Sequence, residues 1–151
     1  MIQLRPARMN DADMLLEWRN DETTRLNFRS TALLERSGHI AWLTKVLGGD
    51  TGIVICMAEV HGSAVGTINS HECDGYQELS YTITPAWRGK GLAIPMVRQF
   101  VKEYLPGKKI QCEIKKGNVS SEKVAQALGL CAKFEKPSTD ADDPRPLVVW
   151  R

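Results

Sequence analysis

Several features that would point to a particular class of protein are missing from this chain of 151 residues. No apolar run approaches the roughly 20 residues that span a bilayer, and the N-terminus has no apolar signal segment, so we expect a cytoplasmic protein without a membrane partner. The four cysteines include no C-x-x-C pair and the three histidines form no cluster, which indicates reduced thiols and no metal site. A net charge of +2 is too small to indicate nucleic-acid binding.

The composition that is present is that of a globular domain. Hydrophobic residues make up 42% of the chain and charged residues 25%, which is typical of a folded protein rather than a disordered one. A chain of 151 residues has the length of one domain with a sizeable core, and it contains neither an internal repeat nor a dividing linker. We therefore expect residues 1–151 to form a single domain.

Hydrophobic spacing and turn residues predict a mixture of helices and strands. Three consecutive strands joined by tight turns within residues 52–84 indicate an antiparallel meander. Residues 21–36 are expected to be irregular, with Phe28 as their apolar anchor, and the polar loop 138–146 is expected to be solvated and mobile. Strands are predicted at residues 2–5, 52–60, 64–70, 78–84, 109–114, 131–135 and 147–150, and helices at 10–20, 39–47, 92–105 and 118–128.

The turn between the predicted strand 78–84 and the helix that follows it has the features of an anion site. Pro85 ends the strand, and two glycines then precede the helix. The first turn of a helix carries unpaired N–H groups and a favourable dipole, and glycines let an anion approach the backbone. Arg88 and Lys90 add positive charge beside it. The pattern therefore predicts a site for a phosphate or pyrophosphate.

The spacing of this turn excludes two common phosphate motifs. A dinucleotide fingerprint read from Gly89 would place Ile94 where a small residue is required, and a P-loop would need Ser or Thr after Lys90. The pattern that fits is R-x-x-G-x-A at Arg88, Gly91 and Ala93. It resembles the acetyl-CoA pyrophosphate loop of the GCN5-related N-acetyltransferases (GNAT).

A second segment extends the resemblance. Asn118-x-x-Ser121 followed by the sequence Ala-Leu-Gly-Leu at 127–130 is similar to the N-x-x-[SA] … L-G-F segment of the same family, and the order of predicted elements is that of its fold. The resemblance implies an α/β (α+β) domain with a mixed, mostly antiparallel twisted sheet of about six or seven strands flanked by about four helices. It implies acetyl-CoA as the cofactor, bound by Ile83, Thr84, Arg88, Gly89, Lys90, Gly91, Leu92, Ala93, Asn118 and Ser121.

Two further patterns indicate which subgroup of this family the chain resembles. Residues 78–85 resemble E-[IL]-[GS]-Y-x-[IL]-x-P, found in ribosomal-protein N-terminal acetyltransferases and their small-molecule-modifying relatives. The N-terminal third is similar to acetyltransferases that modify amino groups of nucleotide-linked deoxysugars. This second resemblance implies substrate contacts from Arg19, Asn20, His39 and Trp42, although a tryptophan such as Trp42 is also a common core residue.

Transfer to an amine requires a proton acceptor and protonation of the departing thiolate. We take Glu78 as the candidate base, acting directly or through water, with a solvated strand-edge carboxylate as the alternative reading. Many family members carry a tyrosine acid at the position of Ala125, so Tyr81, Ser121 or solvent would have to replace it. Strand alternation places Glu78 and Tyr81 on opposite faces unless a bulge intervenes.

Three functions remain open from the sequence. The first is acetyl transfer to a small primary amine such as a nucleotide-linked amino sugar, by a monomer or homodimer. The second is acetylation of a protein N-terminus, and the third is a non-catalytic acyl-CoA-binding module that lost its acid at Ala125. An anionic acceptor is favoured by the basic N-terminal third, which contains Arg5, Arg8, Arg19, Arg25 and Arg29.

Overall fold

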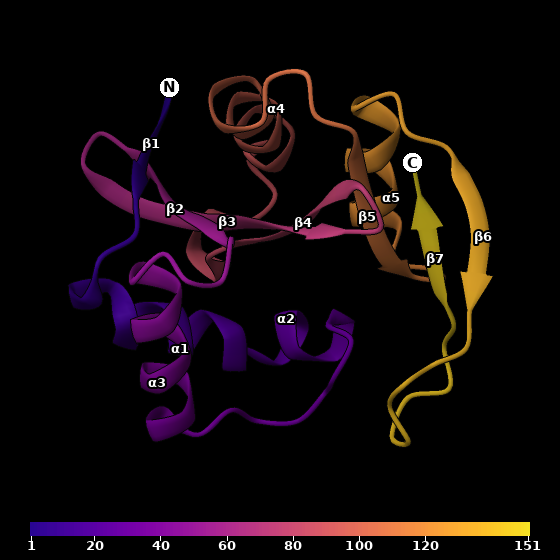
Figure 1. The fold of residues 1–151 in the computed structure, drawn as a ribbon, viewed down its shortest axis with the longest axis horizontal. Coiled ribbons are helices and arrows are strands. Elements are labelled where there is room, and N and C mark those ends of the chain that lie inside the picture. Colours follow the sequence, from indigo (N-terminus) through magenta and orange to yellow (C-terminus); the bar gives the residue numbers. More distant parts are fainter.

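A computed structural model describes residues 1–151 and contains one seven-stranded sheet in the order β1-β2-β3-β4-β5-β7-β6 (Figure 1). The predicted mixed sheet is confirmed. The strands are β1 (Ile2–Pro6), β2 (Val54–Val60), β3 (Ser63–Cys73), β4 (Tyr76–Ile83), β5 (Ile110–Lys115), β6 (Ala132–Lys136) and β7 (Leu147–Trp150). The helices are α1 (Ala12–Asn20), α2 (Glu22–Asn27), α3 (Arg36–Leu47), α4 (Ala93–Tyr104) and α5 (Val119–Ala127), with short 3-10 turns η1 (Met9–Asp11) and η2 (Pro85–Trp87).

The junction between β4 and β5 is the one parallel pairing in the sheet. Only Gln77 with Ile110 and Glu78 with Gln111 are paired there, whereas β3 and β4 pair without a break from Gly66 and Ile83 to Cys73 and Tyr76. Beyond Glu78 the two parallel strands diverge. The divergence leaves the β5 side of residues 79–83 without a neighbouring strand, so their backbone groups on that side lack sheet partners.

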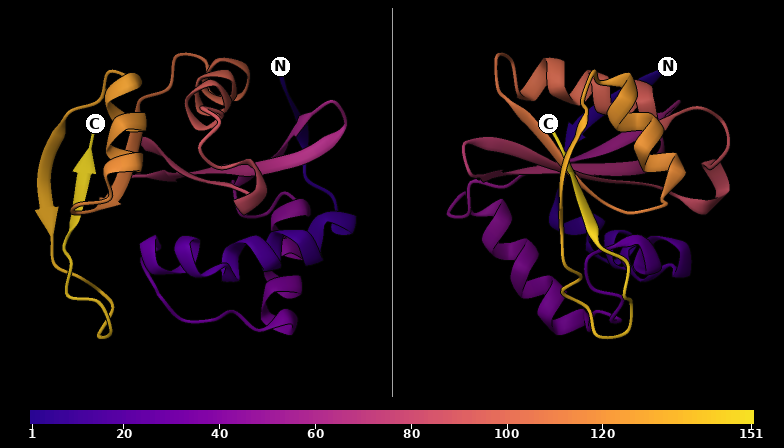
Figure 2. Two further views of the ribbon diagram at one scale, coloured as in Figure 1. Left: turned by 180° about the vertical axis from the view of Figure 1, so that it is seen from behind. Right: turned by 90° about the vertical axis from the view of Figure 1, so that its right-hand side faces the viewer.

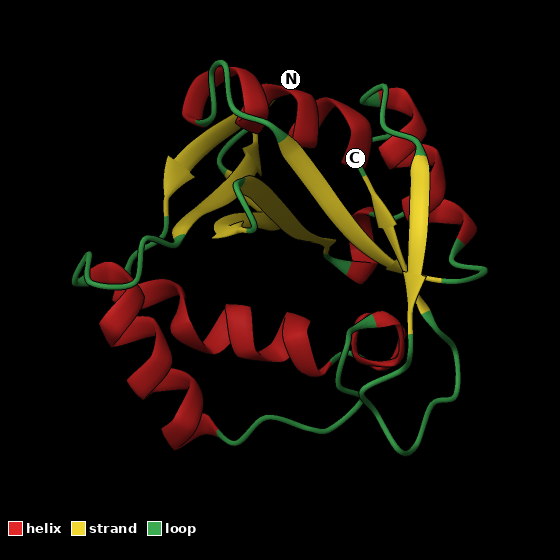
Figure 3. Cartoon of the chain, turned by 45° about the vertical axis from the view of Figure 1, so that its right-hand side comes forward, coloured by secondary structure: helices red, strands yellow, loops and turns green.

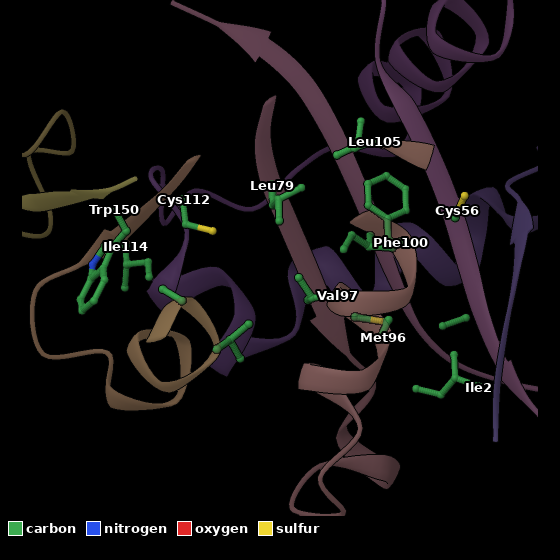
Figure 4. Close-up of a cluster of buried hydrophobic side chains, with 14 of the residues drawn as sticks. Ile2, Cys56, Leu79, Met96, Val97, Phe100, Leu105, Cys112, Ile114 and Trp150 are labelled. Atoms are coloured by element: carbon green, nitrogen blue, oxygen red, sulfur yellow. The ribbon is translucent and has the colours of Figure 1, made fainter. Parts of the chain in front are cut away.

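Helices cover both faces of the sheet, α4 and α5 on one and α1 to α3 on the other (Figures 2 and 3). Two hydrophobic clusters follow this division. Met96, Val97 and Phe100 of α4 pack against strand residues such as Leu79 in the larger cluster, which is drawn in Figure 4. The smaller cluster joins α1 and α3 to β2 through Leu15, Trp18, Leu43, Val46 and Met57. No helix combines the length and the apolar character needed to cross a membrane.

The expectation that residues 21–36 are irregular is wrong for their first part, which forms helix α2. The carboxylate of Asp21 accepts a hydrogen bond from the N–H of Thr24, which caps the helix. A helix of six residues is too short to show a hydrophobic period, so this cap was its only signal in the sequence.

The expectation that loop 138–146 is solvated is wrong for Asp143, which is buried. The ammonium of Lys115, 2% exposed at its side chain, donates to Asp143 at 2.7 Å and to the carbonyl of Leu26 at 3.0 Å. Arg145 donates to Asp143 at 2.8 Å and also reaches the Leu26 carbonyl. The loop contains few apolar residues. The ion pair between Asp143 and Lys115 anchors it to β5, and the hydrogen bond from Arg145 to the Leu26 carbonyl joins it to α2.

Candidate active site

The turn between β4 and α4 has the shape of an anion cradle. Gly89 and Gly91 adopt φ of 73° and 72°, in the left-handed region where glycine is favoured. A Cβ built on either glycine would meet no atom within 4 Å, so the space beside the backbone is open. Leu92, at the N-cap of α4, offers no side-chain cap, and the first N–H groups of the helix remain available.

The side chain of Arg88 forms hydrogen bonds within the protein, so it is not a free cation beside the turn. Its Nη2 donates to the carboxylate of Asp21 at 2.7 Å and to the hydroxyl of Thr24 at 3.0 Å, and its Nε donates to the carbonyl of Ile83 at 3.1 Å. The side chain therefore fastens the turn to α2. The cation that stays exposed is Lys90, whose ammonium lies 5.9 Å from the ring centroid of Trp87.

A cavity of about 370 Å³ opens where β4 and β5 diverge, between the turn and α5. It brings together most of the residues for which the sequence predicted cofactor contacts; Thr84 and Lys90 are outside its wall. Asn118 and Ser121 lie on the α5 side, where Asn118 accepts from the Ser121 N–H at 3.4 Å and donates to its hydroxyl at 3.1 Å. The predicted residues in the wall are Glu78, Tyr81, Ile83, Arg88, Gly89, Gly91, Leu92, Ala93, Asn118 and Ser121.

Tyr81 is the tyrosine in the wall of this cavity, and it could take the place of the tyrosine acid that is absent at Ala125. Burial raises the pKa of Tyr81 to about 12, and a hydrogen bond with Ser121 offsets part of that rise. The phenol is therefore protonated at neutral pH and can donate a hydrogen bond into the cavity. Ala125 is fully buried in the hydrophobic cluster between α5 and the sheet, and its position contributes no polar group.

A second cavity, of about 640 Å³, lies on the face of the sheet covered by α1 to α3. Three of the four predicted substrate residues line it, namely Arg19, His39 and Trp42. Asn20 does not line this cavity. Its side-chain amide donates to the carbonyl of Leu34 at 2.9 Å and accepts from the N–H of Leu34 at 2.8 Å. Ser80, Tyr81 and Thr82 of β4 line both cavities, so a group in one lies across a single strand from a group in the other.

Carboxylates neutralise two of the five arginines on which the prediction of a basic N-terminal third rested. Arg5 pairs with Asp11 and Glu59, and Arg29 pairs with two carboxylates described below. Arg8, Arg19 and Arg25 have no carboxylate partner. Of these, Arg19 lines the second cavity, where it stacks over Phe28 at 3.9 Å and donates to the carbonyl of Ser30 at 3.1 Å. Its Nη1 is buried without a hydrogen bond. Burial, together with the nearby charge of Arg25, lowers the pKa of Arg19.

His39 has a partner inside the fold. The imidazole is buried and its Nε2 lies 3.0 Å from the carbonyl of Ala12, and burial lowers the pKa of the ring. The contact ties α3 to the start of α1. In the lining of the cavity, therefore, the imidazole of His39 is fixed by its hydrogen bond. Trp42, which is 38% exposed, contributes an aromatic face.

Glu78 is buried, and its reading as a solvated strand-edge carboxylate is wrong. The residue is 1% exposed, and Gln111 donates to its Oε1 at 2.9 Å. Its Oε2 lies 2.8 Å from Nη2 of Arg29 and 3.4 Å from Nε2 of His71. The unbroken register of β3 and β4 leaves no bulge that would turn Glu78 and Tyr81 to the same face.

Sequence reasoning missed His71 and the polar wall that β3 contributes to the second cavity, and it named Arg29 only as one of several basic residues. The predicted strand ended at residue 70, whereas β3 continues to Cys73. Thr67, Asn69 and His71 alternate along it and all three line the second cavity. A polar residue at every second position of an extended strand was the signal that could have revealed this wall.

Comparison with known proteins agrees with this arrangement. The family model described as "Acetyltransferase (GNAT) domain" matches residues 2–130. No curated protein matches the chain. Among solved structures, an acetyltransferase from Salmonella typhimurium, yncA, solved with acetyl-CoA, is 19% identical with a TM-score of 0.78, over 99% of this chain and 92% of that one.

Two other solved structures have the same fold. The ribosomal-protein-alanine N-acetyltransferase from Brucella melitensis is 21% identical with a TM-score of 0.78, over 98% of this chain and 97% of that one. The aminoglycoside acetyltransferase AAC(6')-Ib in complex with coenzyme A is 17% identical with a TM-score of 0.77, over 99% of this chain and 94% of that one. With the family model covering most of its length, the chain belongs to the GNAT acetyltransferase family.

Proposed function

We propose that this protein transfers the acetyl group of acetyl-CoA to a primary amine of a small molecule. The observation that carries the proposal is the position of Ser80, Tyr81 and Thr82, which separate the cavity beside the glycine turn from the cavity beneath α1 to α3. A donor held in the first cavity and an amine held in the second would meet at this strand. Bringing two reactants together in this way converts a bimolecular reaction into one within a complex.

The residues of the first cavity fit acetyl-CoA, which supplies an acetyl group activated as a thioester. The open backbone at Gly89 and Gly91 suits a pyrophosphate, which a side chain there would displace. The N–H of Gln77 donates to the residue just before β5 and that of Thr84 donates to β3, so strand alternation directs the N–H groups of Tyr81 and Ile83 into the gap. Such groups can pair with the amides of the pantetheine arm, and one of them can polarise the thioester carbonyl.

Tyr81 suits a hydrogen-bonding role at the leaving sulfur better than a full proton transfer. Its pKa of about 12 lies well above that of an ordinary thiol, roughly 8.5, so transfer to the thiolate would cost about 5 kcal/mol. A hydrogen bond to the departing thiolate carries no such cost and stabilises its charge. Solvent can then protonate the sulfur, and no side chain is needed at Ala125.

The second cavity favours a small acceptor that carries negative charge, such as a nucleotide-linked amino sugar. Arg19 is half-buried and has no carboxylate partner there, and such a guanidinium attracts a phosphate or carboxylate. A polycationic acceptor would meet unfavourable charge instead. A protein N-terminus remains the second candidate, because the fold is shared with a ribosomal-protein-alanine N-acetyltransferase.

The test is release of coenzyme A, measured with a thiol reagent, in the presence of three classes of amine: nucleotide-linked amino sugars, polyamines with aminoglycosides, and peptides with free N-termini. Binding of acetyl-CoA is measured in parallel by calorimetry. Turnover confined to the first class supports the proposal, and turnover confined to peptides supports the second candidate. Acetyl-CoA binding without turnover on any class would instead support a non-catalytic acyl-CoA-binding module.

A further inference from the structure

His71 and Glu78 face each other across neighbouring strands. They are directly paired residues of β3 and β4, so their side chains leave the same face of the sheet. That face is the one covered by α1 to α3, and His71 lines the second cavity. The His71 side chain is 34% exposed, whereas that of Glu78 is 2% exposed. An acceptor in the cavity can therefore reach the imidazole, which is far more accessible than the carboxylate.

The geometry of the pair favours a proton on Nε2 of His71. Nε2 of His71 lies 3.4 Å from Oε2 of Glu78, and that oxygen is buried without a well-aligned hydrogen bond. A proton on Nε2 is attracted to the carboxylate, and this leaves the lone pair on Nδ1 as the free acceptor of the ring. Long contacts of this kind often shorten when a substrate binds.

The charges around Glu78 are balanced, which affects what the carboxylate can do. Arg29 contacts both Glu78, at 2.8 Å, and Glu113, at 3.1 Å, and Lys136 donates to Glu113 at 2.6 Å. Two carboxylates and two cations thus form one cluster. Gln111 donates to one oxygen of Glu78 and Arg29 lies 2.8 Å from the other, so the carboxylate is fixed in place and can orient a neighbour.

We propose that His71 is the catalytic base of the transfer and that Glu78 and Arg29 are positioning residues that hold its ring. The proposal deepens the function proposed above and rests on it. The ammonium group of the acceptor gives a proton to Nδ1 of His71, and the neutral amine forms a C–N bond to the acetyl carbon. The C–S bond breaks, its electrons leave with coenzyme A as a thiolate, and a second proton, lost from the new amide nitrogen, passes to solvent.

The value of such a base follows from the acceptor's own chemistry. An amine with a pKa near 9 is only about 1% neutral at pH 7, so most acceptor molecules enter the site as the ammonium. A positioned general base that takes up the proton during the reaction contributes about a hundredfold or more. At a pH above the amine's pKa the neutral form is already present, and the advantage vanishes. Charged and titratable groups that share this environment are Arg29, Glu113 and Lys136 near Glu78, and Arg19, Glu35 and His39 on the wall of the cavity.

The kinetic test compares the wild type with His71→Gln, His71→Ala and Glu78→Gln, using the acceptor identified by the amine panel. At pH 7, kcat of both His71 variants should fall about a hundredfold with the KM of acetyl-CoA unchanged, and the deficit should shrink as the pH rises past the amine's pKa. Free imidazole should restore part of the rate of His71→Ala. The double variant with Glu78→Gln and His71→Gln should have the same kcat as His71→Gln alone. His61→Asn, in an exposed turn where φ is 49°, serves as the matched histidine control.

A second measurement does not depend on turnover. Long-range ¹H–¹⁵N NMR of the three histidines, assigned by these substitutions, should show the His71 proton on Nε2 and should change in Glu78→Gln. A proton on Nδ1, or a His71→Gln enzyme within threefold of wild type at pH 7, overturns the proposal while leaving the proposed function intact. A wild type that acetylates no amine in the panel removes both.

Discussion

Replacing Gly91 by Asp tests the donor site most directly. Gly91 has φ of 72°, and a Cβ there would meet nothing within 4 Å. In the free protein the substitution therefore costs only backbone strain, about 1–2 kcal/mol for a residue held in the left-handed region. The space that the new side chain would fill is the space assigned to the pyrophosphate.

The loss of affinity can be worked out from the charge. A carboxylate about 5 Å from a phosphate oxygen costs about 1–3 kcal/mol per phosphate charge at an effective dielectric constant between 80 and 20. With displacement of the ligand by the side chain added, we expect a loss of about 2–5 kcal/mol, which is roughly 30- to several-thousand-fold in Kd. Calorimetric titration with acetyl-CoA measures this directly.

Gly62→Asp is the matched control. Gly62 has φ of 79°, and a Cβ there also meets open space, but it lies in the β2–β3 turn. Both variants should lose a similar amount of thermal stability, since they share the strain and the added charge. Only Gly91→Asp should lose affinity for acetyl-CoA. A Kd within threefold of wild type for Gly91→Asp, or an equal loss in the control, would refute the assignment of the turn.

Three further predictions follow from the geometry. Tyr81→Phe should lower kcat by about 10- to 100-fold, the worth of one hydrogen bond to a charged sulfur, with the Kd of acetyl-CoA kept; an unchanged kcat would exclude the contact. Arg19→Gln should raise the KM of an anionic acceptor by at least about tenfold without changing acetyl-CoA binding, and equal KM values would contradict the anion contact. The guanidinium of Arg5, in two hydrogen bonds of 2.8 Å, holds the pKa of Asp11 below its usual value near 3.8. This pair should therefore stabilise the fold above about pH 4 and less as the pH falls further, so urea unfolding of Asp11→Asn should depend less on pH between 5 and 2 than that of the wild type.

The site of the acetyl donor, beside the glycine turn, could be predicted from the sequence because its signals are local. A strand, a proline, two glycines and a helix are consecutive in the chain, and Gly89 and Gly91 adopt the positive φ that their identity suggests. The cap of α5 is equally local, since Asn118 bonds to Ser121 three residues later. Backbone conformation and capping depend on neighbours in sequence, so a single sequence contains most of this information.

The acceptor side could not be predicted in the same way, because its chemistry depends on residues far apart in the chain. The reading of Glu78 as solvent-exposed failed since its partners, Arg29 and Gln111, come from 49 residues before it and 33 residues after it. The charge argument from the N-terminal third holds only in part for the same reason: Arg5 and Arg29 are paired with carboxylates, and a composition does not reveal which arginines are paired. Arg19 keeps an unpaired guanidinium, and only the fold distinguishes it from Arg5.

Helix α2 is a common support for the two sides of the site. Arg88 of the glycine turn binds Asp21 at the start of this helix. Near its end, the carbonyl of Leu26 accepts hydrogen bonds from Lys115 of β5 and Arg145 of the loop after β6. The next segment supplies Arg29, which contacts Glu78. A helix of six residues is not stable alone, so these contacts determine where α2 lies. A displacement of α2 would loosen the glycine turn and withdraw the guanidinium from Glu78 together, and a mutation within it would therefore disturb donor binding and proton transfer at once.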